Sequence, residues 1–162
     1  MGGRAFVWVV AAAAACMMAQ NAGAQARDAR VGAWVERKVS SSYQGLRRSF
    51  EDLGGGMIRV NIAVDANGAA LSSVDLRCDD RPYPVVGQDR QPTGLSLSCR
   101  ALGPGVTAFT FTRASADSWT TSAGTESVSQ DGETMTVSAV QTDPQGRVVN
   151  RIERQFARKP KL

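Results

Sequence analysis

Hydrophobic and polar residues alternate along much of the chain, and the alternation is clearest from Ile58 onward. Ile58, Val60, Ile62 and Val64 fall on one face of an extended segment, and the residues between them are mostly polar. A period of two is typical of a half-buried β-strand, because successive side chains point to opposite faces of the sheet. The pattern therefore predicts a strand that ends at Asp65.

The same pattern continues through the second half of the chain. Further strands are predicted at 106–113, 119–129, 133–141 and 147–157, which are rich in the Thr, Val and aromatic residues that pack well on a pleated surface. Turn sequences such as Asn67-Gly68 and Asp131-Gly132 separate these segments, and they accept the positive φ of tight hairpins. The sequence predicts an all-β fold, an antiparallel up-and-down meander of about eight or nine strands.

The two edge strands of this meander predict that the sheet closes on itself. Short strands in one small domain must protect their unpaired backbone groups, and we expect a small closed barrel or a strongly curled sheet. One stretch is ambiguous, because Tyr43, Leu46, Phe50 and Leu53 fall at helical spacing. Residues 46–53 would also form the first arm of a hairpin across the glycines that follow, and we favour this strand.

A different pattern occupies the N-terminus. Arg4 is the only charge before an apolar run from Ala5 to Ala19, which is followed by small residues. This order is typical of a secretory signal peptide, which we assign to residues 1–24, with cleavage after residue 26 as an alternative. The run is short for a transmembrane helix. A lipoprotein in which Cys16 is acylated stays open as a minor alternative.

Removal of this leader would leave a single domain. We expect one β-barrel-like domain at residues 27–158 and a basic tail at 159–162, in a periplasmic or secreted protein. The chain has 19 Lys and Arg against 15 Asp and Glu, and a basic cluster lies near the C-terminus. In an exported protein such a cluster is more often a solvated terminal strand than a contact with nucleic acid, so we expect no nucleic-acid partner.

The mature chain would hold Cys78 and Cys99, and the protein contains no histidine. A cysteine pair in an exported protein is expected to form a disulfide, because the periplasm keeps thiols oxidised. Two thiolates without histidine leave a zinc site two ligands short, and the spacing is too wide for a C-x-x-C redox motif. Both cysteines fall on the inward face of their predicted strands. The sequence predicts a buried disulfide and neither a metal nor a cofactor.

Three short motifs follow one another at 83–87 (Tyr-Pro-Val-Val-Gly), 129–134 (Ser-Gln-Asp-Gly-Glu-Thr) and 146–150 (Gly-Arg-Val-Val-Asn). In this order and spacing the chain resembles a family of uncharacterised exported bacterial proteins described as lipocalin-like, over roughly residues 32–158. The resemblance implies a lipocalin-like barrel and export, and it brings no catalytic residues to transfer. The cysteine pair is a departure from the family pattern.

Near the start of the domain, Gly32-Ala33-Trp34 is similar to the Gly-x-Trp of true lipocalins. In those proteins the Trp closes one barrel end and packs on an Arg from the last strand. This similarity implies that Arg151 or Arg154 contacts Trp34, in a cation-π interaction of about 0.5–2 kcal/mol. The alternative is that Trp34 is an ordinary core residue.

Catalytic chemistry has little support in the sequence. Without histidine, neither a Ser-His-Asp nor a Cys-His nucleophile can be built. Asp79, Asp80 and Asp89 are candidates for the paired carboxylates of a hydrolase, but Arg81 and Arg90 lie close by in the sequence, which favours solvated charge. We expect a non-catalytic protein.

Aromatic residues offer a candidate binding site for a small apolar or amphipathic ligand. Phe109 and Phe111 share one face of their strand, Trp119 follows them, and Tyr83 or Arg81 would stand at the mouth of the barrel. These aromatic residues would equally serve as ordinary core. The alternative function is an envelope interaction module with a packed core, which contacts a protein partner through the segment between the cysteines or through the basic C-terminus.

Overall fold

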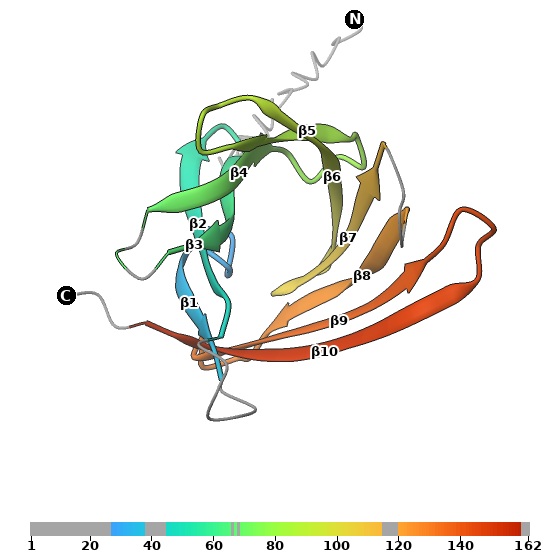
Figure 1. The fold of residues 1–162 in the computed structure, drawn as a ribbon. Helices are drawn as coiled ribbons and strands as arrows, with labels where there is room; N and C mark the ends of the chain where they lie inside the picture. Colours follow the sequence, from blue (N-terminus) through green and yellow to red (C-terminus); the bar gives the residue numbers. More distant parts are fainter. Residues whose placement is uncertain (1–26, 38–44, 66, 68, 115–119, 160–162) are drawn as a thin grey trace, which may run out of the picture.

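The computed structural model describes residues 27–37, 45–65, 67, 69–114 and 120–159, and within them the fold is all-β (Figure 1). The strands along these residues are β1 (Gly32–Glu36), β2 (Arg47–Gly54), β3 (Met57–Val64), β4 (Ala70–Leu76), β5 (Tyr83–Gly87), β6 (Pro92–Gly103), β7 (Val106–Arg113), β8 (Thr121–Val128), β9 (Thr134–Thr142) and β10 (Val148–Arg158). Each strand pairs antiparallel with its neighbours in sequence, and β1 also pairs with β10. The predicted antiparallel meander and its closure into a barrel are confirmed.

The strand count differs slightly from the prediction of eight or nine. Ten strands lie within the described residues, and β1 and β5 are the two that no predicted strand covers. β5 lies between Cys78 and Cys99, in the segment that the disulfide encloses. β5 has five residues and pairs with β4 at only two positions. A strand this short shows too few alternations to be recognised in the sequence.

The ambiguous stretch before the first glycine turn is a strand, as predicted. Residues Arg47–Gly54 form β2, which pairs with β1 and β3. Phe50 points inward and is 2 % exposed, whereas Leu53 is 42 % exposed. The two residues therefore do not share a buried face, as a helix would require. Gly54, Gly55 and Gly56 turn the chain with φ between 60° and 81°, which favours glycine.

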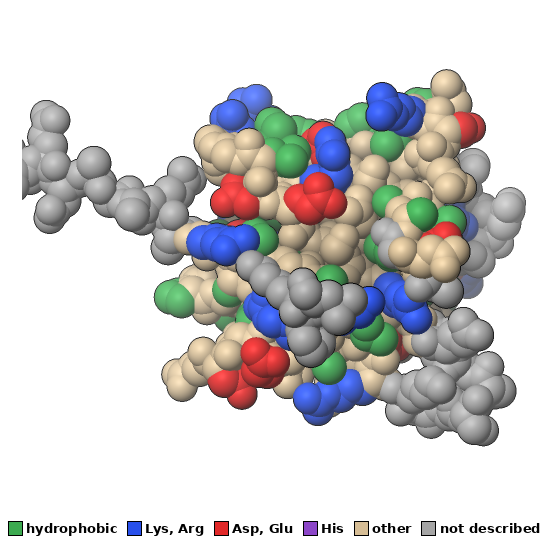
Figure 2. Space-filling model, turned by 90° about the vertical axis from the view of Figure 1, so that its left-hand side faces the viewer, with side chains coloured by type: hydrophobic (Ala, Val, Ile, Leu, Met, Phe, Trp, Pro, Cys, Tyr) green, Lys and Arg blue, Asp and Glu red, His purple; other side chains and the backbone are tan. Residues whose placement is uncertain are grey.

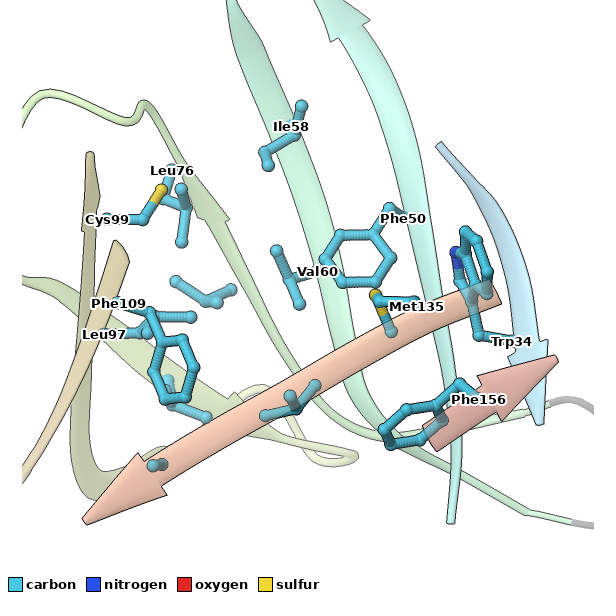
Figure 3. Packing of buried hydrophobic residues seen from close by; sticks show 14 residues of the cluster. Trp34, Phe50, Ile58, Val60, Leu76, Leu97, Cys99, Phe109, Met135 and Phe156 are labelled. Atoms are coloured by element: carbon cyan, nitrogen blue, oxygen red, sulfur yellow. The ribbon is translucent and has the colours of Figure 1, made fainter. Parts of the chain in front are cut away.

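Alternating side chains from almost every strand fill the interior with a hydrophobic core. Its members are Trp34, Phe50, Ile58, Val60, Val74, Leu76, Val85, Leu97, Cys99, Phe109, Met135, Val137, Ala139 and Phe156. In Figure 3, Trp34, Phe50, Met135 and Phe156 lie on one side of the view, and Leu97, Cys99 and Phe109 lie on the other. This inward-facing set is the one that a period of two selects.

The segment before β1 lies across one end of the barrel, which we call the entry end. The entry end comprises residues 27–31 and the β2–β3, β6–β7 and β8–β9 turns. Arg158, at the end of β10, holds these residues together. Its Nη1 donates to the carbonyl oxygen of Val31 at 2.8 Å, its Nη2 donates to that of Ala29 at 2.9 Å, and its Nε donates to that of Gly132. The last strand therefore anchors the first described segment.

Trp34 lies directly beneath this anchor. It is fully buried, its Nε1 donates to the carbonyl oxygen of Arg30 at 2.7 Å, and the Arg158 guanidinium carbon lies 4.3 Å from its ring centroid. A cation-π contact between Trp34 and the last strand is present, but the predicted partners were wrong. Arg151 is exposed, and Arg154 donates to the Glu36 carboxylate. Register decides the partner, because Trp34 pairs with Arg158.

A disulfide strengthens the wall where strand pairing is weakest. Cys78 and Cys99 are joined, with an S–S distance of 2.01 Å, so the predicted disulfide is confirmed. It ties the segment after β4 directly to β6 across the short strand β5. Closing a loop of this length stabilises a fold by about 3 kcal/mol in the chain-entropy model. The disulfide therefore compensates for the weak pairing of β4 with β5, which involves only two positions.

Several predictions about the ends of the chain lie outside the described residues. These are the signal peptide at 1–24, the alternative at Cys16, and most of the basic tail at 159–162. In the part of the chain that the structure describes, no helix is long and apolar enough to cross a membrane.

Gly32 is required by the anchor, and its replacement tests the closure. Its φ is +139°, and a Cβ there would lie 2.7 Å from Nη1 of Arg158. Gly32→Ala is expected to lower the free energy of unfolding by about 3 kcal/mol, the upper range for a strained backbone. Gly146→Ala is the control, because its Cβ would meet no atom within 4 Å and it carries only the left-handed cost of about 1 kcal/mol. Urea unfolding measures both, and equal losses would contradict the proposed role of Arg158.

Candidate functional site

A cavity of about 850 Å³ opens at the entry end of the barrel. Its walls come from the segment before β1, the β2–β3 and β6–β7 turns, and the segment after β4. The lining residues are Arg27, Asp28, Ala29, Asp52, Gly54, Gly55, Gly56, Ile58, Arg77, Cys78, Asp79, Ala101, Gly103, Pro104, Gly105, Val106 and Thr107. The cavity therefore lies beside the disulfide and is assembled from segments that are far apart in the sequence.

The lining combines two kinds of surface. Ile58, Ala101, Pro104 and Val106 supply apolar contacts, and charged side chains supply the rest. Glycines occupy the two turns and contribute no side chain, so they leave the space open. At Gly103, for example, a Cβ would meet no atom within 4 Å. Such a mixture of apolar wall and charged rim suits a molecule that has an apolar part and a polar part.

Four charged side chains form a group at the cavity that we call the ion cluster: Arg30, Arg48 and Glu126 are buried, and Asp28 is partly buried and lines the cavity. Nη1 of Arg30 and Nη1 of Arg48 donate to the two oxygens of Glu126, at 3.1 Å and 2.5 Å. Arg30 also donates to both oxygens of Asp28, at 3.0 Å and 2.7 Å. Two positive and two negative groups therefore cancel, which makes their burial tolerable.

The ion cluster fixes the protonation state of its carboxylates. Burial is the largest influence on Glu126 and raises its pKa, but the charges of Arg48 and Arg30 together outweigh it and hold the pKa below the usual range. The Asp28 carboxyl behaves in the same way beside Arg30, and its pKa is also lowered. Both carboxylates are therefore ionised at neutral pH. The cluster is a fixed electrostatic frame and holds no proton for catalysis.

Phe50 packs against both arginines of the ion cluster. The guanidinium carbons of Arg30 and Arg48 are each 5.3 Å from the centroid of its ring. Cation-π attraction adds to the ion pairs at this distance. Nε of Arg48 is the one buried side-chain nitrogen or oxygen among the described residues that has no hydrogen-bond partner. The ring of Phe50 thus replaces part of the solvation that these cations lose.

The disulfide also touches the ion cluster. Nη2 of Arg30 lies 3.3 Å from Sγ of Cys78, and Cys78 lines the cavity. Cys99 is 2 % exposed and belongs to the hydrophobic core. The predicted burial of the pair therefore holds fully for Cys99 and only in part for Cys78. One wall of the cavity is covalently fixed to the barrel interior.

The residues predicted to bind a ligand are not brought together at this cavity. Phe109 is buried, and its ring packs edge-to-face on Phe111 at 5.8 Å between centroids, so both belong to the core or its margin. Tyr83 packs against the core, and its hydroxyl donates to Asp79. The Arg81 side chain is 81 % exposed. Trp119 lies outside the described residues.

The candidate carboxylates for hydrolysis all have local partners. Asp79 accepts hydrogen bonds from the Tyr83 hydroxyl and the Arg81 amide, at 3.1 Å and 3.2 Å. Asp80 lies 3.4 Å from Arg100, and Asp89 accepts the Gln91 amide at 3.0 Å. Across the described residues, no group of three or more His, Cys, Asp or Glu side chains is arranged to hold a metal ion.

The outer wall offers no comparable feature on the face shown in Figure 2. Lys and Arg side chains stand apart from one another there, among acidic, apolar and neutral groups. Neither charge nor apolar surface gathers into one large patch on that face. The cavity is therefore the better candidate site.

Sequence reasoning missed the ion cluster, although the alternation carries a signal for it. Glu126 lies at an inward position of the predicted 119–129 strand, and Arg48 lies two residues before the inward-facing Phe50. Charged residues at inward positions of a small barrel need partners of opposite charge. The search for such positions would have found Arg48 and Glu126, but it would not have found Arg30, which lies outside every strand.

Comparison with known proteins adds no relative. No protein-family model matches the chain, and no curated protein matches it. The resemblance to exported lipocalin-like proteins therefore stays a prediction, while the closed antiparallel barrel that it implies is present.

Glu126 provides a test of the ion cluster. Glu126→Gln leaves two buried guanidinium groups without their shared carboxylate and is expected to cost about 3–5 kcal/mol of unfolding free energy at pH 7. Because the folded pKa is lowered, this stabilisation is complete above the usual pKa of a Glu and is lost as the pH falls through the folded value. The difference between wild type and variant should shrink below about pH 4.

Glu133→Gln is the matched control, because Glu133 is exposed in the β8–β9 turn. It should change the free energy of unfolding by less than about 0.5 kcal/mol at every pH. Urea titrations between pH 3 and pH 7 at about 0.1 M salt measure both variants. A constant deficit for Glu126→Gln across this range would show that the carboxylate charge is not what stabilises the barrel.

Proposed function

We propose that the protein is an exported, non-catalytic β-barrel that binds a small amphipathic molecule in the cavity at the entry end. The cavity itself is the observation that carries this proposal. Its volume of about 850 Å³ falls within the roughly 300–1,000 Å³ that is typical of small-molecule sites. Its lining offers apolar contacts and charged groups together, which matches a molecule with both characters.

The rigidity of the walls supports the same function. The disulfide fixes the segment after β4, Arg158 anchors the segment before β1, and the ion cluster joins that segment to β2 and β8. A preformed site loses less conformational entropy on binding than a flexible one. These constraints around a cavity therefore favour a binding role. The disulfide also supports an oxidising compartment, in agreement with the predicted signal peptide.

The site differs from the one proposed from the aromatic residues. Phe109 and Phe111 take part in the core, so we do not place a ligand between them. The segment between the cysteines contributes Cys78 and Asp79 to the cavity, and Tyr83 supports the Asp79 carboxylate from behind. The proposed ligand therefore lies against the start of this segment.

A protein partner in the envelope is the second candidate function. Leu53 and Leu102 are 42 % and 51 % exposed, and both lie in the hairpins that border the cavity. Exposed leucines beside a cavity are suited to contact a partner's apolar side chain. Crosslinking in cells from residue 53 or 102 to one reproducible protein, without a retained small molecule, would favour this function over the first.

Ala101 provides a test of the cavity as a binding site. It lines the cavity and pairs with the inward-facing Thr107, so Ala101→Phe is expected to fill part of the space. The probes are three amphiphiles with the same twelve-carbon chain: dodecanoate, dodecyl maltoside and dodecylammonium, each below its micellar concentration. We expect at least one to bind wild type, and Ala101→Phe to weaken it at least about tenfold in calorimetric titration, equal to 1.4 kcal/mol.

Ala123→Phe is the matched control. Ala123 is exposed on the outer face of β8 and does not line the cavity, so this variant should bind as wild type does. The proposal is wrong if none of the three amphiphiles binds, or if both variants weaken binding to the same extent.

A further inference from the structure

The charges that line the cavity divide into engaged and free groups. Its carboxylates belong to Asp28, Asp52 and Asp79, and each accepts hydrogen bonds from neighbouring groups. Asp28 receives the Arg30 guanidinium at 2.7 Å, and Asp52 receives the Gly54 amide at 2.9 Å. Asp79 receives the Tyr83 hydroxyl at 3.1 Å. Asp79 also lies 3.9 Å from Nε of Arg81, so two of the three carboxylates are paired with arginines, and among the described residues Asp52 alone of the three has no cationic partner.

The two arginines that line the cavity are in the opposite situation. Within the described residues, neither Arg27 nor Arg77 forms a hydrogen bond or an ion pair with a protein group. Each guanidinium carries five N–H donors in a planar arrangement that matches carboxylate and phosphate oxygens. The hydrogen-bond donors of the cavity that have no partner in the described part of the protein therefore belong mainly to cationic groups.

Arg77 is the better placed of the two. It directly precedes the disulfide-bonded Cys78, so its backbone is held to β6. Its Nη2 lies 4.0 Å from the position that a Cβ of Gly55 would take, so the guanidinium extends to the β2–β3 turn. The absence of a side chain at Gly55 leaves this face of the guanidinium accessible. One side of the cavity is formed by the β2–β3 turn and the other by the disulfide. Arg77 places its guanidinium, unpaired among the described residues, between these two sides.

The apolar lining lies within the same cavity. Ile58, Ala101 and Val106 line it together with Arg77 and Arg27. A molecule with an anionic head and an apolar tail would place its head on the guanidinium groups and its tail on these side chains. An uncharged head would leave the guanidinium donors unused, and a cationic head would meet Arg77 and Arg27 with like charge.

We propose that the cavity selects amphiphiles with an anionic head, a carboxylate or a phosphate, and that Arg77, assisted by Arg27, binds this head. This inference rests on the proposed binding function and specifies its ligand class. It concerns the entry end of the barrel, where the segment before β1, the β2–β3 turn and the disulfide meet.

The three amphiphiles with one common tail test the head group separately from the tail. Dodecanoate is expected to bind wild type at least about tenfold more tightly than dodecyl maltoside, with dodecylammonium the weakest. Arg77→Gln should weaken dodecanoate about tenfold and leave dodecyl maltoside unchanged, and Arg27→Gln should have a smaller effect in the same direction. Because the Arg77 side chain forms no hydrogen bond or ion pair with the described residues, the unfolding midpoint of its variant should equal that of wild type.

Arg90→Gln is the matched control, since it removes the same charge from an exposed turn that does not line the cavity. It should retain the full preference for dodecanoate. Equal affinity for the three heads, or an undiminished preference in Arg77→Gln, would overturn the anionic-head inference and leave the binding function intact. Failure of all three amphiphiles to bind would overturn both.

Discussion

The contact of Arg158 with the segment before β1 is the interaction on which the closed barrel depends. β1 and β10 pair through only a few residues, Trp34 to Glu36 against Phe156 to Arg158. The Arg158 guanidinium extends this short ladder by donating to carbonyl oxygens beyond the strand and by stacking on Trp34. Without it, the ends of the sheet would be joined by a short seam with exposed backbone groups. The entry end, and the cavity at that end, exist because this seam is sealed.

The ion cluster shows how the barrel accommodates charge inside a hydrophobic core. Removing Arg30, Arg48 and Glu126 from water is costly, and the mutual attraction within the ion cluster returns only part of that cost. The cluster fixes the position of the segment before β1. Asp28 and Arg30 belong to that segment, and they are tied through Glu126 to Arg48 on the opposite part of the wall. Apolar side chains would also bury this segment, but they would not fix which of its residues lies at which place on the barrel. The segment that lines the cavity is therefore located by charge.

Much of the fold could be predicted from the sequence, and much of the site could not. A period of two and the glycine turns are local signals, and they identified β7 to β10 almost to the residue. The disulfide followed from composition, since few alternatives exist for two cysteines without histidine. The partner of Trp34 depends on register across the closing seam, and alternation says which residues of β10 face inward but not which one lies opposite Trp34. The cavity depends on turns that meet in space, for which no local pattern exists.

The closing seam has a consequence for the order of folding. Val31 and the Arg158 side chain that holds it are 127 residues apart in sequence. β1 therefore waits for β10, and the edge of β1 that pairs with β10 stays open until β10 has been synthesised. Contacts of such long range are slow to form, and an open edge invites pairing with other chains during the delay. A chain of this topology is most prone to aggregate between the synthesis of β1 and its pairing with β10.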